Sequence, residues 1–357
     1  MADKTIEQAL SDLIVSRRGS SLDWSSRIKA NRLYKLASQG QWLKLLNYVS
    51  GSAAGALRLK HAPNKPYFLS LDPTNACQLK CPFCIGGRRH GNDFISFDIY
   101  ERLMRRLGPT LLKIDFCKGA EPLLHPRICD MVRLAKSYGL ETVIASNLNH
   151  IPDPEQLLSC GLDLLMMSID GLTQETYSRY RAGGDCAKAM SHMELLAHTR
   201  KRLGKNSPFL VWNYLVFKHN EHEIPQVVEK ARQIGVDSVT FMTPSIPNDP
   251  QTRQSWQSTL PQFQDYGQSS RDKYCYWPWG GLDVRPDGKV AICYGHAQEQ
   301  LLCSTEELLR DFANIWNGPK MRAARRGVAL NGTTRSDGTA LECCRACPGC
   351  GCSNFTV

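Results

Sequence analysis

The sequence predicts an α/β protein in which six parallel strands and their helices form a partial (β/α)6, TIM-like barrel, followed by a small cysteine-rich domain. From residue 67 onward, short apolar runs alternate with longer segments of mixed polarity, which is the rhythm of a parallel sheet wrapped by helices. Three cysteines directly follow the first run, and cysteines gather again near the C-terminus. We expect a basic helical extension at 1–66, the barrel at 67–246, and a linker with the cysteine-rich domain at 247–357.

The expected barrel strands are six apolar runs, at 67–71, 111–116, 141–145, 163–169, 209–217 and 238–242. In barrels of parallel strands, reactive groups gather where the strands end. Motifs of cysteine and polar residues follow the first four of these runs. We therefore expect the functional groups to meet at the carboxyl end of the barrel.

The first motif is a C-x3-C-x2-C run formed by Cys77, Cys81 and Cys84. Iron–sulfur clusters of the four-iron type are normally held by four thiolates, so a triplet without a nearby fourth cysteine leaves one iron open to another ligand. From the residues alone, a zinc site that uses the C-x2-C pair, or three unrelated thiols, are the alternatives.

This triplet closely resembles the motif of the radical S-adenosylmethionine (SAM) superfamily. The resemblance implies a [4Fe-4S] cluster whose open iron binds the amino and carboxylate groups of SAM. It also implies reductive cleavage of SAM to a 5′-deoxyadenosyl radical, which abstracts hydrogen from unactivated C–H bonds. The cofactors carry this chemistry and the protein directs it. An electron donor such as flavodoxin or ferredoxin is then an expected partner.

Two further motifs follow the second and third expected strands. Gly119, Ala120 and Glu121 resemble the family's Gly-Gly-Glu motif, with alanine in place of the second glycine. In the family this segment binds the SAM amino group largely through its backbone, so alanine matters only if the position needs a positive φ. Ser146 and Asn147 stand where many relatives carry Thr-Asn-Gly. The resemblance makes all five cofactor-binding candidates.

The fourth expected strand leads into Ser168, Asp170 and, further on, Arg181. These residues look like the family's Ser-x-Asp-Gly…Tyr-Arg pattern, which implies that Ser168 contacts the SAM ribose and Arg181 the carboxylate. Arginine suits a carboxylate because its planar fork donates two parallel hydrogen bonds. Helix capping by Ser168 or Asp170 and a surface role for Arg181 are the structural alternatives. Cys117 ends the second strand, and we expect it as a catalytic hydrogen-atom donor facing the cavity.

A second group of cysteines lies in the C-terminal quarter. Cys275, Gly288 and Cys293 follow a C-x12-G-x4-C layout, and a C-x2-C pair, Cys344 and Cys347, comes later. The layout resembles the SPASM/twitch extension of radical SAM enzymes, which implies one auxiliary [4Fe-4S] cluster held by the four cysteines. A zinc ribbon is the alternative for this region alone. Three more cysteines could replace members of this set or help to hold a second cluster, namely Cys343, Cys350 and Cys352.

Composition excludes some classes of protein. The 357 residues include 15 cysteines, but no apolar run approaches the roughly 20 residues that span a bilayer, and Met1 is not followed by an apolar signal core. We therefore expect a cytoplasmic protein with metal-binding cysteines rather than disulfides. Residues 1–66 hold eleven Lys/Arg against four Asp/Glu, and 42–49 has an amphipathic helical pattern. That charge fits a solvated helix face, an anionic substrate, an acidic partner or a membrane surface.

The predicted function is a radical SAM enzyme that abstracts hydrogen from a polar small molecule such as a sugar, aminocyclitol or nucleoside. Dehydrogenation and epimerisation are both open outcomes. Two enzymatic alternatives are the maturation of a ribosomally made peptide and sulfur insertion from the auxiliary cluster. A zinc protein that binds nucleic acid is the alternative from another class, but it leaves the motifs at the strand ends unexplained. We expect no nucleic-acid partner.

Overall fold

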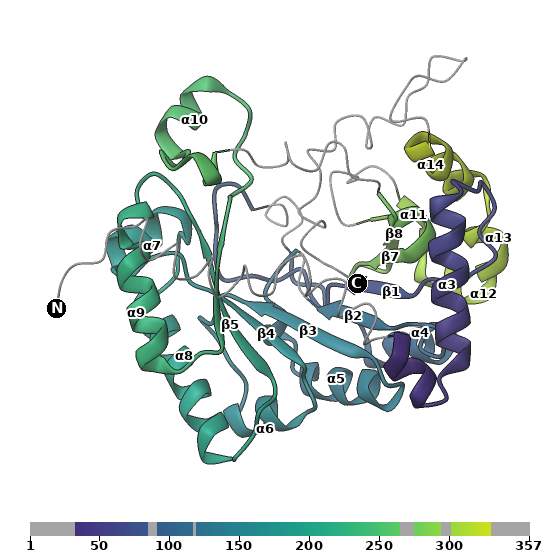
Figure 1. Ribbon diagram of the computed structural model, residues 1–357, viewed down its shortest axis with the longest axis horizontal. Helices are drawn as coiled ribbons and strands as arrows, with labels where there is room; N and C mark the ends of the chain where they lie inside the picture. Colours follow the sequence, from purple (N-terminus) through teal and green to yellow (C-terminus); the bar gives the residue numbers. More distant parts are fainter. Residues whose placement is uncertain (1–32, 85–90, 117–118, 265–274, 294–300, 330–357) are drawn as a thin grey trace.

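The computed structural model describes residues 33–84, 91–116, 119–264, 275–293 and 301–329. Its strands form one sheet in the order β6-β5-β4-β3-β2-β1-β7-β8-β9 (Figure 1). The first six are β1 (Phe68–Leu71), β2 (Lys113–Phe116), β3 (Glu141–Ser146), β4 (Leu164–Ser168), β5 (Phe209–Leu215) and β6 (Ser238–Met242). All neighbours among these six are parallel, which confirms the predicted barrel strands.

Helices connect the parallel strands and cover the outer face of the curved sheet (Figure 1). They are α4 (Phe97–Leu107), α5 (Ile128–Ser137), α6 (Pro154–Ser159), α7 (Gln174–Tyr180), α8 (Cys186–Arg202) and α9 (Ile224–Ile234), with the short 3-10 turns η2 (Pro122–Leu124) and η3 (Glu221–Glu223). After β6 come α10 (Pro250–Trp256) and the turn η4 (Pro261–Phe263). Before β1, α3 (Trp42–Ala56) stands at the opposite edge of the molecule from α9.

Side-chain caps fix where many of these helices begin. The Ser96 hydroxyl accepts from the Ile99 amide at the start of α4, and Asp153 and Asp185 accept in the same way at the starts of α6 and α8. Thr173 forms a capping box at the start of α7. Each cap satisfies a backbone N–H that has no partner inside the helix, so the chain leaves each strand end along a defined path.

Alternate residues of each strand point to opposite faces of the sheet. Leu69 and Leu71 of β1 pack into the main core together with Tyr100 and Leu103 of α4. Phe68 faces the other way, where it belongs to a second cluster with Trp277. The sheet therefore separates an apolar layer under the helices from an inner face that is open to polar groups.

The cysteine-rich region begins as a continuation of the barrel sheet. Strand β7 (Gly281–Val284) pairs in parallel with β1, and β8 (Lys289–Ala291) and β9 (Leu301–Ser304) add to it as antiparallel strands. The predicted hairpin at Pro286-Asp287-Gly288 is confirmed, with Gly288 at a φ of 78°. Helices α11 (Trp277–Gly280), α12 (Thr305–Arg310), α13 (Phe312–Trp316) and α14 (Pro319–Ala329) surround it. In the described part of the chain, no helix is both long and apolar enough to cross a bilayer.

Candidate active site

The three cysteines of the triplet lie on one loop that follows β1. Cys77, Cys81 and Cys84 are all half-buried free thiols, and all three interact electrostatically with one another. Burial raises the pKa of Cys77 to about 12 and also raises the pKa of Cys81, where the neighbouring Arg181 acts in the opposite direction. Because metal ligands must be thiolates, these thiols would lose their protons when they bind iron.

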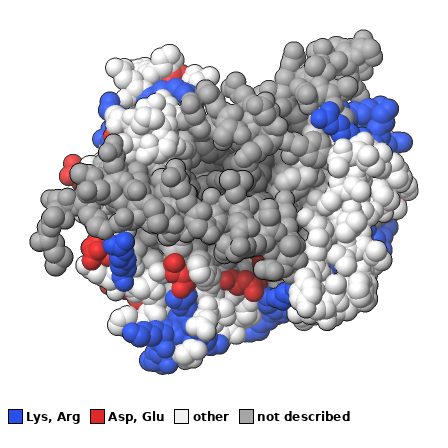
Figure 2. Space-filling model, in the orientation of Figure 1, with Lys and Arg blue, Asp and Glu red and all other residues white. Residues whose placement is uncertain are grey.

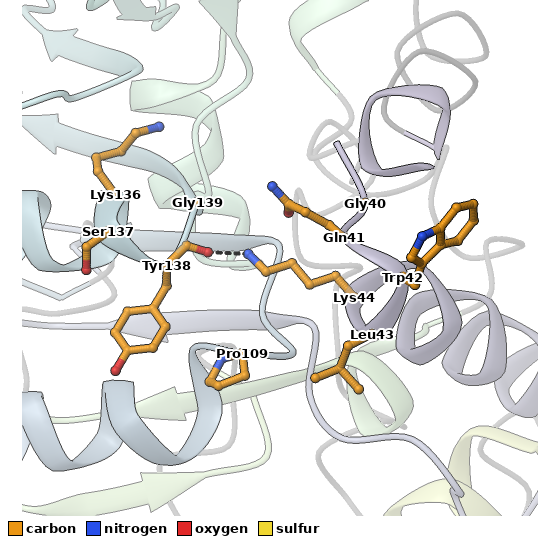
Figure 3. Close-up of a pocket in the computed structure, with 10 residues that line it drawn as sticks. All are labelled: Gly40, Gln41, Trp42, Leu43, Lys44, Pro109, Lys136, Ser137, Tyr138 and Gly139. Carbon is orange, nitrogen blue, oxygen red and sulfur yellow. Dashed lines mark hydrogen bonds between the residues drawn. The ribbon is translucent and has the colours of Figure 1, made fainter. Parts of the chain in front are cut away.

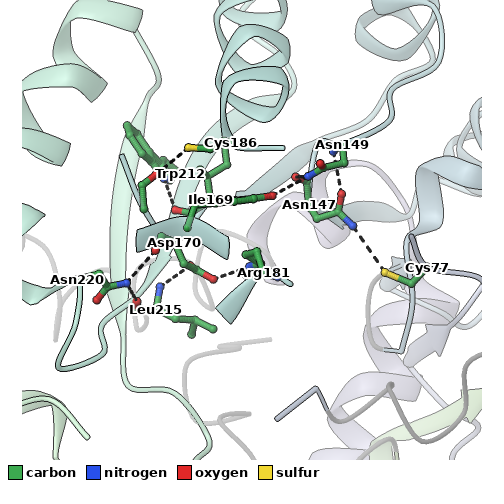
Figure 4. A network of polar contacts seen from close by, with 12 residues as sticks. Cys77, Asn147, Asn149, Ile169, Asp170, Arg181, Cys186, Trp212, Leu215 and Asn220 are labelled. Carbon is green, nitrogen blue, oxygen red and sulfur yellow. Dashed lines mark hydrogen bonds and ion pairs between the residues drawn. The ribbon is translucent and has the colours of Figure 1, made fainter. Parts of the chain in front are cut away.

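Asn147, which follows β3, is the residue that joins the triplet loop to the rest of the strand ends. Its side-chain amide donates to Cys77 Sγ at 3.7 Å, and its side-chain oxygen accepts from the Gln78 amide group at 3.1 Å (Figure 4). The same oxygen accepts from the backbone N–H of Asn149 at 2.8 Å. The Leu79 backbone N–H also points at Cys77 Sγ, at 3.4 Å. These donors would stabilise negative charge on the Cys77 sulfur.

The Glu121 carboxylate is buried and binds backbone N–H groups of neighbouring loops. It is 1% exposed, and its two oxygens accept from the backbone N–H groups of Asn147 at 2.8 Å and Leu123 at 3.1 Å. Burial raises the pKa of Glu121 to about 7, although these hydrogen bonds oppose the shift. Its own N–H donates to the Ala76 carbonyl, which lies beside Cys77. Glu121 therefore holds the loops after β1, β2 and β3 in one arrangement.

The alanine that replaces a glycine in this motif is tolerated without strain. Among the described non-glycine residues, positive φ angles occur only at Arg58 and Leu148, and Ala120 is not one of them. The preceding Gly119 N–H donates to the Asp72 carboxylate at 3.0 Å. The backbone that would bind the SAM amino group therefore needs no positive φ at this position, and alanine fits there.

Asp170 and Arg181 form a buried ion pair after β4. Arg181 Nε lies 2.5 Å from Asp170 Oδ2, and their side chains are 13% and 0% exposed (Figure 4). The other Asp170 oxygen accepts from the Leu215 N–H at 2.8 Å, and the side-chain amide of Asn220 donates to the Asp170 carbonyl. Burial raises the pKa of Asp170, and Arg181 lowers it. The Arg181 charge also lowers the pKa of Cys81, so a fixed positive charge stands beside the triplet.

The remaining predicted residues occupy the same end of the sheet with fewer contacts. Ser168 is the half-buried last residue of β4. Ser146 is the buried last residue of β3, and its hydroxyl hydrogen-bonds Glu121 and accepts from the Leu148 N–H. Cys117 lies outside the described residues, so its catalytic role stays a prediction.

A cluster of packed aromatic rings beside the triplet was not predicted from the sequence. Trp256, at the end of α10, packs edge-on against Phe83, with ring centroids 4.9 Å apart, and against Phe217 at 5.6 Å. Phe83 stands between Cys81 and Cys84 in the chain. The contact joins segments that are far apart in sequence, so no local pattern could have revealed it.

Sequence reasoning also missed a buried polar row across β2, β1 and β7. Asp115, Ser70 and Asp283 are direct neighbours in the strand register, and each is fully buried. Ser70 Oγ donates to Asp283 at 2.8 Å, Lys113 Nζ lies 3.3 Å from Asp115, and Arg285 Nε lies 3.5 Å from Asp283. Because Ser70 alternates with Leu69 and Leu71, this row lies on the inner face of the sheet.

Two of the four predicted auxiliary-cluster cysteines are described. Cys275 and Cys293 are half-buried and pack against the inner cluster that contains Phe68 and Trp277, on either side of the β7–β8 hairpin. Five C-terminal cysteines lie outside the described residues, namely Cys343, Cys344, Cys347, Cys350 and Cys352. Cys129, Cys160 and Cys186 are buried in the main core, as expected of structural thiols.

The residues of the triplet suit an iron–sulfur cluster. Thiolates are the usual ligands of such clusters, the three thiols share one loop, and N–H donors already point at the Cys77 sulfur. Within the described ranges, no three His, Cys, Asp or Glu side chains are grouped so as to hold a single metal ion. The triplet would hold the cluster, with Arg181 acting on Cys81 and the Glu121 N–H bonded to the Ala76 carbonyl next to Cys77.

Comparison with known proteins decides the family. The profile of the radical SAM superfamily matches residues 71–252, about half of the chain, and covers the triplet and the strand-end motifs. The chain belongs to the radical SAM superfamily. A second profile, SPASM, described as an iron–sulfur cluster-binding domain, matches residues 275–348. The cofactors of this radical SAM enzyme are therefore SAM, the [4Fe-4S] cluster that binds it, and auxiliary iron–sulfur.

Relatives of this radical SAM enzyme have varied activities. The tungsten-containing aldehyde ferredoxin oxidoreductase cofactor-modifying protein of Pyrococcus furiosus is 27% identical over 51% of the chain, which spans 54% of that protein. PqqA peptide cyclase of Rhodopseudomonas palustris is 24% identical over 82% of the chain and 84% of its own length.

Solved structures show the same fold. SuiB of Streptococcus suis bound to S-adenosylmethionine superposes with a TM-score of 0.57 at 15% identity, over 80% of this chain and 72% of SuiB. SuiB bound to its precursor peptide SuiA gives a TM-score of 0.58 at 14% identity, over 82% of this chain and 72% of SuiB.

Proposed function

We propose that this enzyme modifies a polar small molecule in the cytoplasm by abstracting hydrogen from one of its unactivated carbons. The carrying observation is the buried row of Asp115, Ser70 and Asp283 on the inner face of the sheet, below the strand ends that hold the triplet. When bound, the reduced cluster and SAM supply a 5′-deoxyadenosyl radical, and auxiliary iron–sulfur supplies an electron acceptor.

The residues of the strand ends have separate tasks in this proposal. Cys77, Cys81 and Cys84 hold the cluster, and the backbone at 119–120 binds the SAM amino group. Arg181 binds the SAM carboxylate and is aimed by Asp170, whose second oxygen is fixed by a backbone N–H. A preset arginine loses little freedom when it binds its ligand, which favours tight and oriented binding.

The inner row suits a substrate with hydroxyl or amino groups. It offers carboxylates at Asp115 and Asp283 and cations at Lys113 and Arg285, all of them buried. Buried charges on an inner face hold polar groups in a fixed orientation, since the surrounding protein screens them far less than water does. Sugars, aminocyclitols and nucleosides carry such groups.

The outcome that we propose is dehydrogenation, with epimerisation as the other product of the same hydrogen abstraction. Dehydrogenation needs an electron acceptor near the substrate. Cys275 and Cys293 flank the β7–β8 hairpin, and β7 is the strand that carries Asp283. Epimerisation needs a hydrogen donor instead, and Cys117 is our candidate for it. A flavodoxin or ferredoxin would deliver the first electron.

A peptide substrate is the second candidate. It is favoured by the extent of the match to PqqA peptide cyclase, which covers more than four fifths of both chains.

The substrate class can be tested with fractionated host-cell extract. Reduced, reconstituted enzyme with SAM is given either the protease-treated, dialysable metabolites or the peptide fraction, and 5′-deoxyadenosine is measured. We expect the metabolites to raise its formation about tenfold over the substrate-free rate, and the peptides to leave it unchanged. Stimulation by the peptide fraction alone would replace the first candidate by the second.

Replacing Cys293 by serine should separate SAM cleavage from turnover. Because Cys293 lies on the β8 side of the hairpin, away from the triplet loop, we expect substrate-free 5′-deoxyadenosine formation close to that of the wild type. Bound iron should fall by about four per chain, and product formation should be lost. Cys303→Ser, a half-buried thiol on β9, is the matched control and should keep both activities. Wild-type product formation by Cys293→Ser would exclude a role for the auxiliary site.

A further inference from the structure

Helix α3 packs on the protein with the opposite face from the one expected of an amphipathic helix. Leu45 and Tyr48 pack inward against the second apolar cluster, but four large apolar side chains point outward: Trp42 is 57% exposed, Leu43 59%, Leu46 67% and Val49 49%. These four residues, the α3 stripe, share one side of the helix because positions three, four and seven apart lie together. In a monomeric protein such a continuous apolar stripe usually marks a binding surface.

Polar contacts hold α3 in this orientation. The Asn47 amide donates to the carbonyls of Lys65 at 3.0 Å and Thr110 at 3.3 Å, and Lys44 Nζ donates to the Tyr138 carbonyl. Gly51 lets the helix approach closely, since a Cβ there would lie 2.6 Å from Asn64 Nδ2. Hydrogen bonds, close approach at Gly51 and the packing of Leu45 and Tyr48 fix the inner face, so the α3 stripe cannot turn inward without breaking these contacts.

A basic pocket of about 440 Å³ opens at the N-terminal end of the stripe, between α3 and the turn from α5 to β3 (Figure 3). Trp42 and Leu43 line it together with Lys44 and Lys136. Lys44 is only 6% exposed, and in the described part of the chain its one hydrogen-bond partner is the Tyr138 carbonyl. Burial and the nearby Lys136 lower its pKa to about 8.

The pocket has the properties of an anion site. A buried ammonium normally pairs with a carboxylate, but among the described residues the charged group that acts on Lys44 is a second cation, Lys136, whose own partner is Asp163 at 2.7 Å. Gly139 leaves space beside it, since a Cβ there would lie 3.4 Å from Gln41 Nε2 and 3.7 Å from Lys44 Nζ. An anionic group in this space would accept hydrogen bonds from the side chains of Gln41 and Lys44.

The charge around the α3 stripe has one sign. Residues 33–66 contain five Lys/Arg and no Asp/Glu. Helix α11 contacts both α3 and α14, and α14 adds exposed Lys320, Arg322 and Arg326. In Figure 2 the Lys and Arg of the upper right lie where Figure 1 places α14, next to the mostly uncharged surface over α3. Two copies joined through this face would bring like charges together, which disfavours self-association.

We propose that α3 docks this enzyme on an anionic lipid bilayer. The α3 stripe enters the boundary between headgroups and acyl chains, and a lipid phosphate occupies the Lys44 pocket. An apolar helix face with Trp at one end and basic residues around it is the arrangement that binds membrane surfaces. Docking would place the enzyme at the surface without any spanning helix.

The test is flotation of anaerobically purified full-length protein with vesicles. We expect binding to phosphatidylcholine vesicles that contain phosphatidylglycerol, no binding to phosphatidylcholine alone, and release at high salt. Leu46→Glu should abolish binding, because it places a charge in the middle of the stripe. Lys44→Met should weaken it about fivefold, as expected for one cation at an anionic surface. Leu195→Glu is the control: Leu195 is an exposed apolar residue on α8, 44% exposed, and this variant should bind as the wild type does.

A second measurement keeps the proposal open to refutation if the Lys44 variant folds poorly. Lipids with brominated chains should quench the protein's tryptophan fluorescence, and Trp42→Phe should remove most of that quenching. Three results would overturn the proposal. The first is equal binding to both kinds of vesicle. The second is Lys44-dependent binding of inorganic phosphate without any binding to vesicles. The third is a dimer in sedimentation velocity that Leu46→Glu dissociates, again without binding to vesicles.

Discussion

The variant Cys81→Ser is expected to form no 5′-deoxyadenosine above background when reduced in the presence of SAM. Serine is a poor ligand for iron, and in our proposal three thiols hold the cluster, so the loss of one leaves two. Arg181, which we propose binds the SAM carboxylate, lowers the pKa of this same thiol by its charge, so the variant also removes that electrostatic interaction. The measurement is 5′-deoxyadenosine by liquid chromatography, together with iron per chain.

Cys186→Ser is the matched control for this experiment. Cys186 is buried at the start of α8, where its thiol donates to the Gly171 carbonyl, a bond that serine can also make. It should keep wild-type SAM cleavage. If Cys81→Ser cleaved SAM as fast as the control does, the triplet would not be the cluster site.

Removing the charge of Arg181 is expected to have the second largest effect, a loss of both stability and SAM binding. Arg181→Met leaves Asp170 buried without its cation, which should lower the free energy of unfolding by about 3–5 kcal/mol. SAM binding should also be lost, since methionine cannot pair with a carboxylate. Arg202→Met, which breaks the exposed pair with Glu155, is the control and should cost at most about 1 kcal/mol with SAM binding unchanged.

The double variant Asp170→Asn/Arg181→Met separates the structural part of this effect from the binding part. Without the buried carboxylate, much of the lost stability should return, because no uncompensated charge remains. SAM affinity should stay low. Recovery of SAM binding in the double variant would mean that Arg181 serves only to neutralise Asp170.

The six barrel strands could be predicted because each is a short apolar run between turn signals, and the runs differ from the observed strands only at their ends. The run at 209–217, for example, is longer than β5 by two residues, since Val216 and Phe217 stay buried after the strand ends. The triplet was equally visible, because its spacing is local.

Features that depend on register or on distant contacts could not be predicted. The row of Asp115, Ser70 and Asp283 exists only because β2, β1 and β7 pair in a particular register. Trp256 meets Phe83 through the return of α10 to the strand ends. For α3, the periodicity revealed an apolar stripe, but not that hydrogen bonds from Asn47 would turn it outward.

The way in which the cysteine-rich region joins the barrel sheet could not be predicted from the sequence either. The hairpin was predicted from its Pro-Asp-Gly turn, whereas the parallel pairing of β7 with β1 was not. This pairing places Cys275 and Cys293 beside Phe68, on the same inner face as Ser70.

The most direct test of the central claim is anaerobic reconstitution of the full chain with iron and sulfide, followed by reduction with SAM and assay of 5′-deoxyadenosine. We predict 5′-deoxyadenosine with about eight irons per chain, four at the triplet and four at one auxiliary site. Tightly bound zinc with no cleavage of SAM would contradict the account.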